Sequence, residues 1–228
     1  MSLLVKICGL STPETVAAAR DAGADMLGFV FFPKSPRHVA LRDAQPLFGL
    51  ARTISAFRKS ARPCRIVALV VNAGQPLLDD IACELTPDFF QCHGSETPLE
   101  VAHIANDPGT PVIKALGVSA ADDLAAAPAY AAAGATILID AKPPKDAAYP
   151  GGHGKPFDWT ILRGLDPGLP FMLSGGLTPE TVGEAIRTVR GFGVNLVGVD
   201  VSSGVETAPG VKDVDRIRAF VAAVRQAE

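Results

Sequence analysis

The sequence is poor in aromatic residues and has no long apolar run. Phenylalanine, tryptophan and tyrosine make up 6% of its 228 residues, so its core must consist mainly of aliphatic side chains and alanine. No apolar stretch approaches the ~18 residues that a membrane-spanning helix needs. The N-terminal residues have neither a charged lead nor a long apolar segment, which argues against a secretion signal. We therefore expect a soluble, cytoplasmic protein with no membrane partner.

An excess of charge of one sign is also lacking. The chain has 21 basic and 24 acidic residues, and no basic block stands out, so we expect no nucleic-acid partner. Hydrophobic residues make up 48% and charged residues 20%, which excludes an intrinsically disordered chain. We find no linker and no break in composition, and therefore expect a single domain over residues 1–228.

The spacings typical of metal sites and disulfide frameworks are absent. The four cysteines form no C-x-x-C pair and no zinc spacing, so we expect four free thiols, mostly buried. His93 stands alone near the end of an apolar run, where a hydrogen-bonded core histidine is more common than a metal ligand. We therefore predict no metal.

The sequence does contain a regular alternation of short apolar runs and alanine-rich helical stretches. Consecutive apolar residues are typical of parallel strands that are covered on both faces. The expected strands are Leu3–Cys8, Met26–Phe31, Ile66–Val71, Phe89–Cys92, Val112–Leu116, Thr136–Asp140, Phe171–Leu173 and Leu196–Val199. The expected helices are Pro13–Ala22, Leu41–Lys59, Pro76–Glu84, Pro98–Asn106, Ala120–Ala133, Asp158–Leu162, Pro179–Thr188 and Val214–Gln226.

Local signals support these helix boundaries. Thr12-Pro13, Thr97-Pro98 and Thr178-Pro179 each place a capping side chain before a proline suited to the first helical position. Ala-Gly-Ala at residues 22–24 and 133–135 is typical of a helix stop followed by a short turn.

Eight strands in strict alternation with helices predict an α/β fold, a single-domain (β/α)8 TIM barrel. The rival fold is an open doubly wound sheet. That fold usually carries the glycine-rich turn G-x-G-x-x-G after its first strand, and residues 8–12 (CGLST) do not fit it.

Glycine-rich segments follow three neighbouring strands of the predicted barrel. They are Gly151–Lys155, Ser174-Gly175-Gly176 and Ser202-Ser203-Gly204. Barrels commonly bind phosphate after the seventh and eighth strands, where backbone N–H groups can approach the ligand. The alternative is three ordinary turns. Three such segments on adjacent strands favour a phosphate site. The sequence has no G-x-x-x-x-G-K-[ST] motif, so a nucleoside-triphosphate site is not indicated.

Three further polar residues stand at the ends of expected strands. Asp140 ends the sixth, where partial desolvation can suit a carboxyl group to general acid work. The alternative for Asp140 is a helix cap or a salt bridge to Lys142, and Asp200 carries the same ambiguity. Cys8 ends the first strand and faces the barrel interior together with Lys6, because the side-chain period is two.

The role of Cys8 has two readings. A thiol near a cation and a cluster of backbone amides could be shifted toward the thiolate and act as a base. The other reading is a buried structural cysteine.

Several motifs together resemble phosphoribosylanthranilate isomerase, in order along nearly the whole chain. They are Lys6-Ile7-Cys8-Gly9, Gly28-Phe29-Val30-Phe31 with Ser35-Pro36-Arg37, Gln91-Cys92-His93-Gly94, Gly151-Gly152-His153-Gly154 with Phe157-Asp158-Trp159, Ser174-Gly175-Gly176-Leu177, Gly198–Glu206 (GVDVSSGVE) and Pro209–Asp213 (PGVKD). Cys92 and Ser174 depart from the residues usual in the family, and both stand beside the reactive positions.

The resemblance implies an Amadori rearrangement in tryptophan biosynthesis, without metal or cofactor. The substrate would be N-(5-phosphoribosyl)anthranilate. The resemblance makes Cys8 the general base and Asp140 the general acid, with Arg37 on the anthranilate carboxylate and Asp200 orienting the sugar or the amine. The implied phosphate-binding residues are Gly154, Gly175, Gly176, Ser202, Ser203 and Gly204. The assembly is expected to be a monomer or a homodimer.

Two alternatives remain open at this point. A related sugar-phosphate isomerase of histidine biosynthesis performs the same rearrangement but uses aspartate where Cys8 stands. A non-catalytic phosphate-binding barrel would bind ligand without turnover, and would leave the pairing of Cys8 with Asp140 unexplained.

Overall fold

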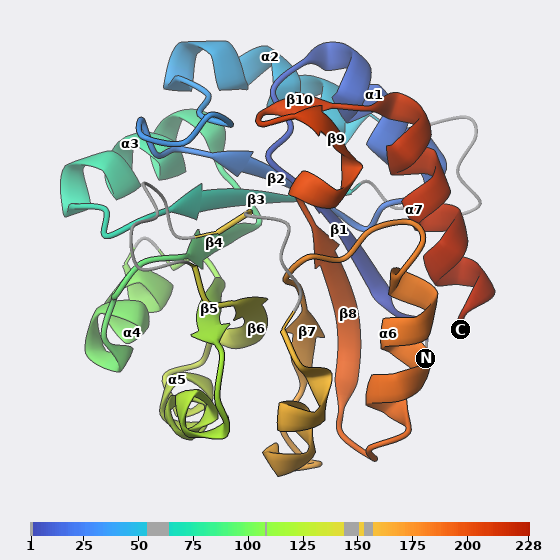
Figure 1. Cartoon of the computed structure of the whole chain (residues 1–228). Coiled ribbons are helices and arrows are strands. Elements are labelled where there is room, and N and C mark those ends of the chain that lie inside the picture. Colours follow the sequence, from blue (N-terminus) through green and yellow to red (C-terminus); the bar gives the residue numbers. More distant parts are fainter. Residues whose placement is uncertain (1, 54–63, 108, 144–150, 153–156) are drawn as a thin grey trace.

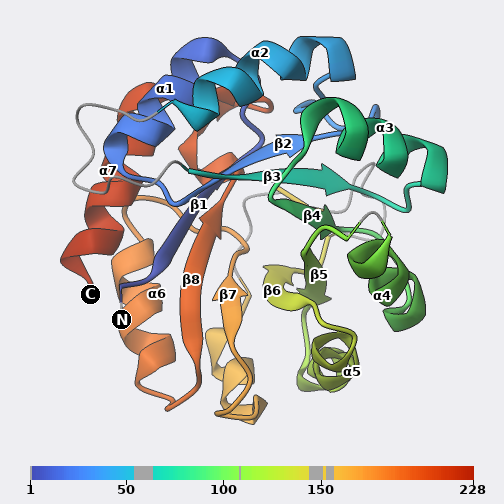
Figure 2. The ribbon, with the colours of Figure 1, turned by 180° about the vertical axis from the view of Figure 1, so that it is seen from behind.

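The computed structural model describes all residues except 1, 54–63, 108, 144–150 and 153–156. Eight parallel strands pair in sequence order, and β1 also pairs with β8, which closes a barrel and confirms the predicted fold. Helices surround this barrel on the outside (Figures 1 and 2). The strands are β1 (Leu4–Cys8), β2 (Met26–Val30), β3 (Arg65–Val70), β4 (Phe89–Cys92), β5 (Val112–Val118), β6 (Thr136–Ala141), β7 (Phe171–Leu173) and β8 (Leu196–Val201).

The strands are buried on both faces. Val5 and Ile7 of β1 belong to the large apolar cluster between the barrel and its helices. Lys6 and Cys8 take the opposite face and point into the barrel, as the period of two predicts. A second, smaller apolar cluster that includes Met26, Ile113 and Leu138 fills the interior beneath the open end.

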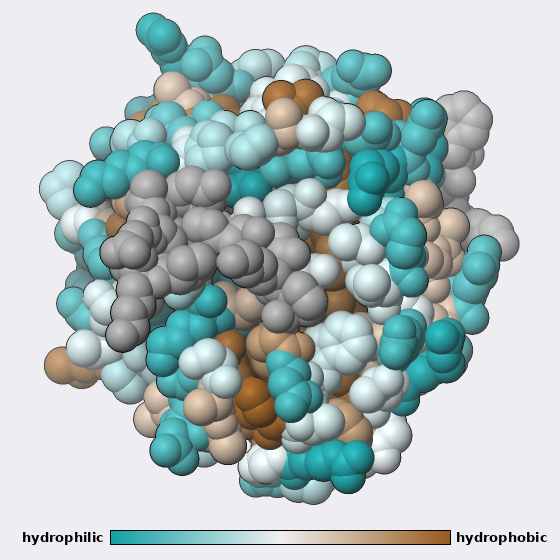
Figure 3. Space-filling model, viewed as in Figure 1, coloured by the Kyte–Doolittle hydropathy of each residue, from teal (hydrophilic) through white to brown (hydrophobic). Residues whose placement is uncertain are grey.

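The outer layer contains α-helices and shorter 3₁₀ segments. They are α1 (Pro13–Ala22), α2 (Leu41–Arg52), α3 (Gln75–Leu85), α4 (Pro98–Asn106), η1 (Ala121–Ala126), α5 (Ala127–Ala132), η2 (Trp159–Gly164), α6 (Val182–Arg190) and α7 (Val214–Gln226). A further 3₁₀ segment, η3 (Ser203–Val205), lies in the loop after β8. No helix among the described residues has the length and apolar character needed to cross a membrane. Hydrophilic residues are spread around the edge of the face in Figure 3, with smaller apolar groups between them.

Two of the three predicted proline caps are confirmed. The Thr12 side chain accepts the Thr15 N–H, and Thr97 forms a capping box with Glu100. The third prediction was wrong, because Pro179 lies in a turn and α6 begins at Val182. That turn is closed by the Thr181 hydroxyl, which accepts the Thr178 N–H at 3.0 Å.

The predicted helix Ala120–Ala133 was also wrong as one element. It divides into η1 and α5, with Pro128 in the first turn of α5. Proline has no N–H to donate to the preceding turn, so the first segment cannot continue through it. The segment Asp158–Leu162 is a 3₁₀ helix rather than an α-helix, and α2 ends at Arg52; the predicted residues 54–59 lie outside the described residues.

A hairpin that the sequence patterns did not predict follows η3. It consists of β9 (Glu206–Ala208) and β10 (Val211–Lys212). Its turn residue Gly210 has a positive φ of 84°, and a Cβ there would overlap the carbonyl oxygen of Pro36. The hairpin therefore packs tightly on the loop that carries Arg37.

Candidate active site

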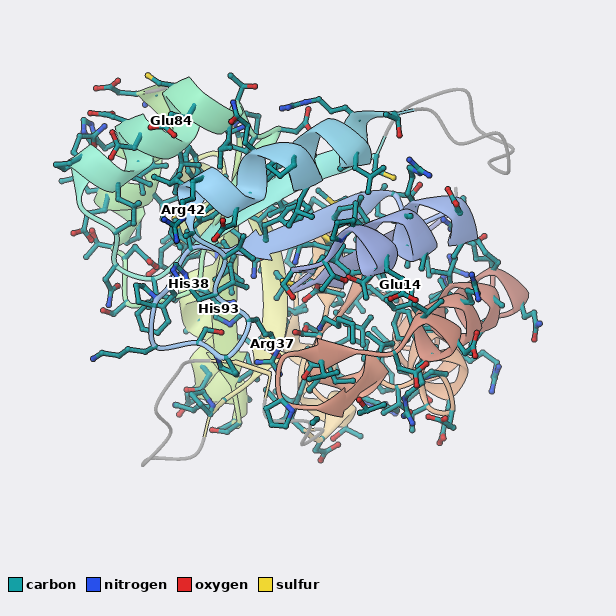
Figure 4. All side chains as sticks on the ribbon, turned by 90° about the horizontal axis from the view of Figure 1, so that it is seen from above. Glu14, Arg37, His38, Arg42, Glu84 and His93 are labelled. Carbon is teal, nitrogen blue, oxygen red and sulfur yellow. The ribbon has the colours of Figure 1, made fainter. Side chains whose placement is uncertain are left out.

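A pocket of about 360 Å³ opens at the carboxyl ends of the barrel strands. This volume falls in the usual range for small-molecule sites, roughly 300–1,000 Å³. The predicted site residues that line it are Cys8, Arg37, Asp140, Gly175, Gly176, Asp200, Ser202, Ser203 and Gly204. Gly154 lies outside the described residues. Figure 4 labels two side chains of the lining, Arg37 from the loop after β2 and His93 after β4.

Cys8 ends β1 and is buried at the base of the pocket. Gly28 on β2 makes room for it, because a Cβ at Gly28 would lie 2.9 Å from the Cys8 sulfur. Burial raises the pKa of Cys8 above its ordinary value, although Lys6 and Lys212 oppose that shift. The suggested shift toward the thiolate is therefore wrong, since desolvation outweighs the nearby cations.

Lys6 and Asp200 form a buried ion pair next to Cys8. Lys6 Nζ donates to Asp200 Oδ1 at 2.8 Å, and Ser174 Oγ donates to Asp200 Oδ2 at 3.2 Å. Burial by itself lowers the pKa of Lys6, but Asp200 and Cys8 raise it above the ordinary lysine value. Lys6 is therefore a fixed cation beside the thiol.

Asp140 lies on the other side of the pocket, at the end of β6. Its Oδ1 accepts the N–H of Ala141 at 2.9 Å, and its Oδ2 lies 3.1 Å from His93 Nε2. The suggested salt bridge to Lys142 does not form, because Lys142 pairs with Asp123 at 2.7 Å. His93 is hydrogen-bonded, as expected, but it also lines the pocket beside Asp140.

Arg37 forms an ion pair with Glu206 at the mouth of the pocket. Its Nε and Nη2 each donate to one oxygen of Glu206 at 2.8 Å, and Nη2 also donates to the Gly152 carbonyl at 3.1 Å. Lys212 Nζ donates to the same carboxylate at 2.7 Å. Sequence reasoning missed the parts played by Glu206 and Lys212, although both stand inside the motifs that carry the resemblance.

Lys212 connects this ion cluster to one of the glycine-rich loops. Its Nζ donates to the carbonyl oxygen of Ser202 at 2.9 Å and contacts the Ser202 hydroxyl at 3.2 Å. Burial lowers the pKa of Lys212 to about 8, and Glu206 opposes that shift. The cluster thus ties the loop after β8 to the loop after β2.

The two described glycine-rich loops bring backbone close to the pocket. Gly175 and Gly176 have φ of 86° and 69°, a conformation that favours glycine. A Cβ at Gly175 would lie 2.5 Å from the Ala141 nitrogen, and one at Gly204 would overlap the Leu177 carbonyl oxygen. Side chains at these positions would displace backbone, so glycine allows the loop after β7 to pack closely against β6 and against the loop after β8.

The wall opposite these loops is apolar. Val30, Phe32, Leu69 and Val71 line it from β2, β3 and the loops that follow them. The sequence analysis did not assign a substrate-binding role to these four residues. Among the residues that the structure describes, no group of three histidine, cysteine or acidic side chains could hold a metal ion.

Comparison with known proteins identifies the family to which the chain belongs. The family model described as N-(5'phosphoribosyl)anthranilate (PRA) isomerase matches residues 5–223. An N-(5'-phosphoribosyl)anthranilate isomerase of Rhodopseudomonas palustris (strain HaA2) is 54% identical over 228 residues, covering 100% of this chain and 98% of the relative.

Solved structures agree with this result. The phosphoribosyl anthranilate isomerase of Thermotoga maritima has a TM-score of 0.80 and 35% identity, over 98% of this chain and 99% of that chain. A phosphoribosyl anthranilate isomerase in complex with reduced 1-(o-carboxyphenylamino)-1-deoxyribulose 5-phosphate has a TM-score of 0.77 and 32% identity, with the same coverage. The resemblance drawn from the motifs is confirmed, and the chain belongs to the N-(5'-phosphoribosyl)anthranilate isomerase family.

Proposed function

We propose that this pocket carries out the Amadori rearrangement of N-(5-phosphoribosyl)anthranilate by proton transfers at Asp140 and Cys8. The product is 1-(2-carboxyphenylamino)-1-deoxyribulose 5-phosphate, an intermediate of tryptophan biosynthesis. One observation carries the residue assignment: Asp140 on β6 and Cys8 on β1 line one pocket, with the glycine-rich loops of β7 and β8 between them.

The two ends of the substrate match the two sides of the pocket. The loops at Gly175-Gly176 and Ser202-Ser203-Gly204 hold the phosphate through backbone N–H groups. The aromatic ring then extends toward the apolar wall formed by Val30, Phe32, Leu69 and Val71. Arg37 lies on that side, where its guanidinium can meet the ring carboxylate. Anchoring both ends fixes the ribose between acid and base.

The acid acts first. Asp140 gives its proton to the ribose ring oxygen, the bond from C1′ to that oxygen breaks, and the amine lone pair forms the iminium C=N bond. Its carboxylate is then held by the Ala141 N–H and by His93.

The base acts on the iminium. The Cys8 thiol first releases its proton to water, and the thiolate then takes the C2′ proton. The electrons of that C–H bond form the C1′=C2′ bond of the enolamine, and the iminium nitrogen becomes an amine. C1′ then gains a proton and the C2′ hydroxyl loses one, which gives the ketone. The positive charge of the iminium and the cations Lys6 and Lys212 oppose the effect of burial on the thiol. Thiolate formation is therefore favoured when substrate is bound and ring-opened. Asp200, held by Lys6, orients the sugar or the amine.

The remaining assignments complete the proposal. We propose one domain over residues 1–228, a cytoplasmic location, and a monomer or homodimer that needs neither metal nor cofactor. The experiment is a continuous assay of anthranilate fluorescence with freshly prepared substrate, with and without a chelator. Turnover that is unchanged by the chelator supports the proposal, whereas no turnover of this substrate contradicts it.

A further inference from the structure

Gln91 is a buried polar residue that the proposed reaction does not use. It points into the barrel from β4 and is fully buried. Its partners in strand register are Leu69 on β3 and Ile113 on β5, and both have apolar side chains. An amide in this position carries four hydrogen-bonding sites into an apolar layer. Glutamine here therefore needs a reason beyond packing.

The amide has one described polar contact. Gln91 Nε2 lies 2.9 Å from His93 Nδ1, whereas Gln91 Oε1 is buried and has no hydrogen-bond partner among the described residues. Turning the amide over would place Oε1 against His93 and leave the NH₂ group without a partner instead. Either orientation leaves one polar end unsatisfied, which costs stability relative to an apolar side chain of similar size. The contact with His93 is thus the interaction that glutamine makes here and that an apolar side chain of similar size would not make.

The orientation of the Gln91 amide is linked to the tautomer of His93. An amide N–H that donates to Nδ1 requires the neutral imidazole to carry its proton on Nε2, whereas the turned amide would accept a proton from Nδ1. With its proton on Nε2, His93 donates to Asp140 Oδ2, which lies 3.1 Å away. In the opposite tautomer Nε2 carries a lone pair. That lone pair would face the Asp140 carboxylate, or would accept the proton that Asp140 has to transfer to the substrate.

We propose that Gln91 is a positioning residue for Asp140: through its amide N–H it fixes His93 in the Nε2–H tautomer that orients the Asp140 carboxyl group. This inference rests on the proposed role of Asp140 as the general acid. With the Ala141 N–H on Oδ1 and His93 on Oδ2, the carboxyl group is held from both oxygens. The carboxylate left after proton transfer is stabilised by the same two donors.

The first test measures the tautomer in the wild-type protein. Long-range ¹H–¹⁵N spectra of the full chain with ¹⁵N-labelled histidine distinguish Nδ1–H, Nε2–H and the imidazolium. The chain has four histidines, and the His93 signals are those lost in the His93→Asn variant. We expect the proton of the His93 imidazole on Nε2. A proton on Nδ1, or on both nitrogens, would overturn the proposal, and this result requires no folded variant of Gln91.

The second test separates positioning from packing. Gln91→Met keeps the volume but removes the donor, and should lower kcat about tenfold with KM changed less than about twofold, because a general acid contributes ~10²–10⁴-fold in all. In a His93→Asn background the same substitution should change kcat no further. Full additivity of the two substitutions would show that Gln91 acts independently of His93.

A matched control lies next to Gln91 on the same strand. Cys92 is buried and faces the helices instead of the barrel interior. Cys92→Ala should leave the His93 tautomer and kcat unchanged, and a loss equal to that of Gln91→Met would indicate a general disturbance of β4. If Asp140→Asn retained full activity while His93 still carried its proton on Nε2, the proposed acid would be wrong although the tautomer assignment held.

Discussion

Cys8 and Asp140 are the two residues at which the proposed proton transfers occur. Both side chains are buried at the ends of strands and reach the same pocket. Cys8→Ala and Asp140→Asn should each lower kcat by ~10²–10⁴-fold, the usual contribution of one acid or base. Steady-state kinetics measure the loss, and circular dichroism confirms that the variants fold. Wild-type turnover in either variant would remove that residue from the mechanism.

Arg37 has a different role, because the carboxylate it is proposed to bind is remote from the bonds that change. A contact of this kind is similar in the ground state and the transition state, so Arg37→Ala should raise KM more than it lowers kcat. A charge-assisted pair contributes ~1.5–3 kcal/mol, which predicts a loss of roughly ten- to a hundredfold in kcat/KM.

The bidentate pair with Glu206 offers a competing role for Arg37, that of bracing the pocket mouth. An aniline analogue of the substrate without the carboxylate separates the two roles. If Arg37 binds the carboxylate, the variant loses most of the wild-type preference for the carboxylated substrate. An undiminished preference would assign Arg37 to bracing alone.

The hairpin β9–β10 acts as one element that joins the two ends of the pocket. Glu206 on β9 holds Arg37, and Lys212 on β10 holds Glu206 and Ser202. The lowered pKa of Lys212, about 8, predicts that the lysine keeps its charge below that pH and loses it above. We therefore expect kcat/KM to fall as the pH rises through about 8, because the phosphate side of the pocket then loses a cation.

The hairpin prediction is checked with Lys212→Met, which cannot titrate. Its kcat/KM should be lower than that of the wild type at pH 7 and should lack the decline near pH 8. Lys34 is exposed and is not among the described residues that line the pocket, so Lys34→Met should keep the wild-type profile. An identical alkaline decline in the Lys212 variant would assign the decline to another group.

At the scale of the whole molecule, ligand binding should stabilise the barrel, because the pocket collects residues from strands at both ends of the sequence. At a concentration of 100 times its Kd, a ligand that binds only the folded state adds ~2.7 kcal/mol. For a chain of this size that corresponds to a rise in Tm of roughly 5–10 °C. Reduced 1-(o-carboxyphenylamino)-1-deoxyribulose 5-phosphate is the ligand to use, with thermal unfolding as the readout.

The same compound without its phosphate is the control for that measurement. The glycine-rich loops are proposed to bind the phosphate, so the control should raise Tm far less at equal concentration. Equal shifts for the two compounds would show that those loops contribute no affinity.

The sequence by itself determined the barrel and the polar and glycine residues that stand at the strand ends around the pocket. Apolar strand runs, caps such as Thr12-Pro13 and glycines such as Gly175 are signals carried by neighbouring residues, so they can be recognised without a structure. Strand order then places the carboxyl ends of all strands on one face, which brought Cys8, Asp140 and Asp200 together. Where the prediction of a local element failed, the cause was also local. Pro128 ended the preceding segment, and the hydrogen bond between Thr178 and Thr181 closed a turn before α6.

Only the tertiary structure decided how the charges are paired. Arg37 and Glu206 are 169 positions apart, and Lys6 and Asp200 are 194 apart, so no local pattern joins them. The pKa of Cys8 is likewise set by burial among residues from several strands, which overrode the effect expected from Lys6 alone. Hydrogen bonds and desolvation depend on distances across the closed barrel, and those distances exist only after the chain has folded.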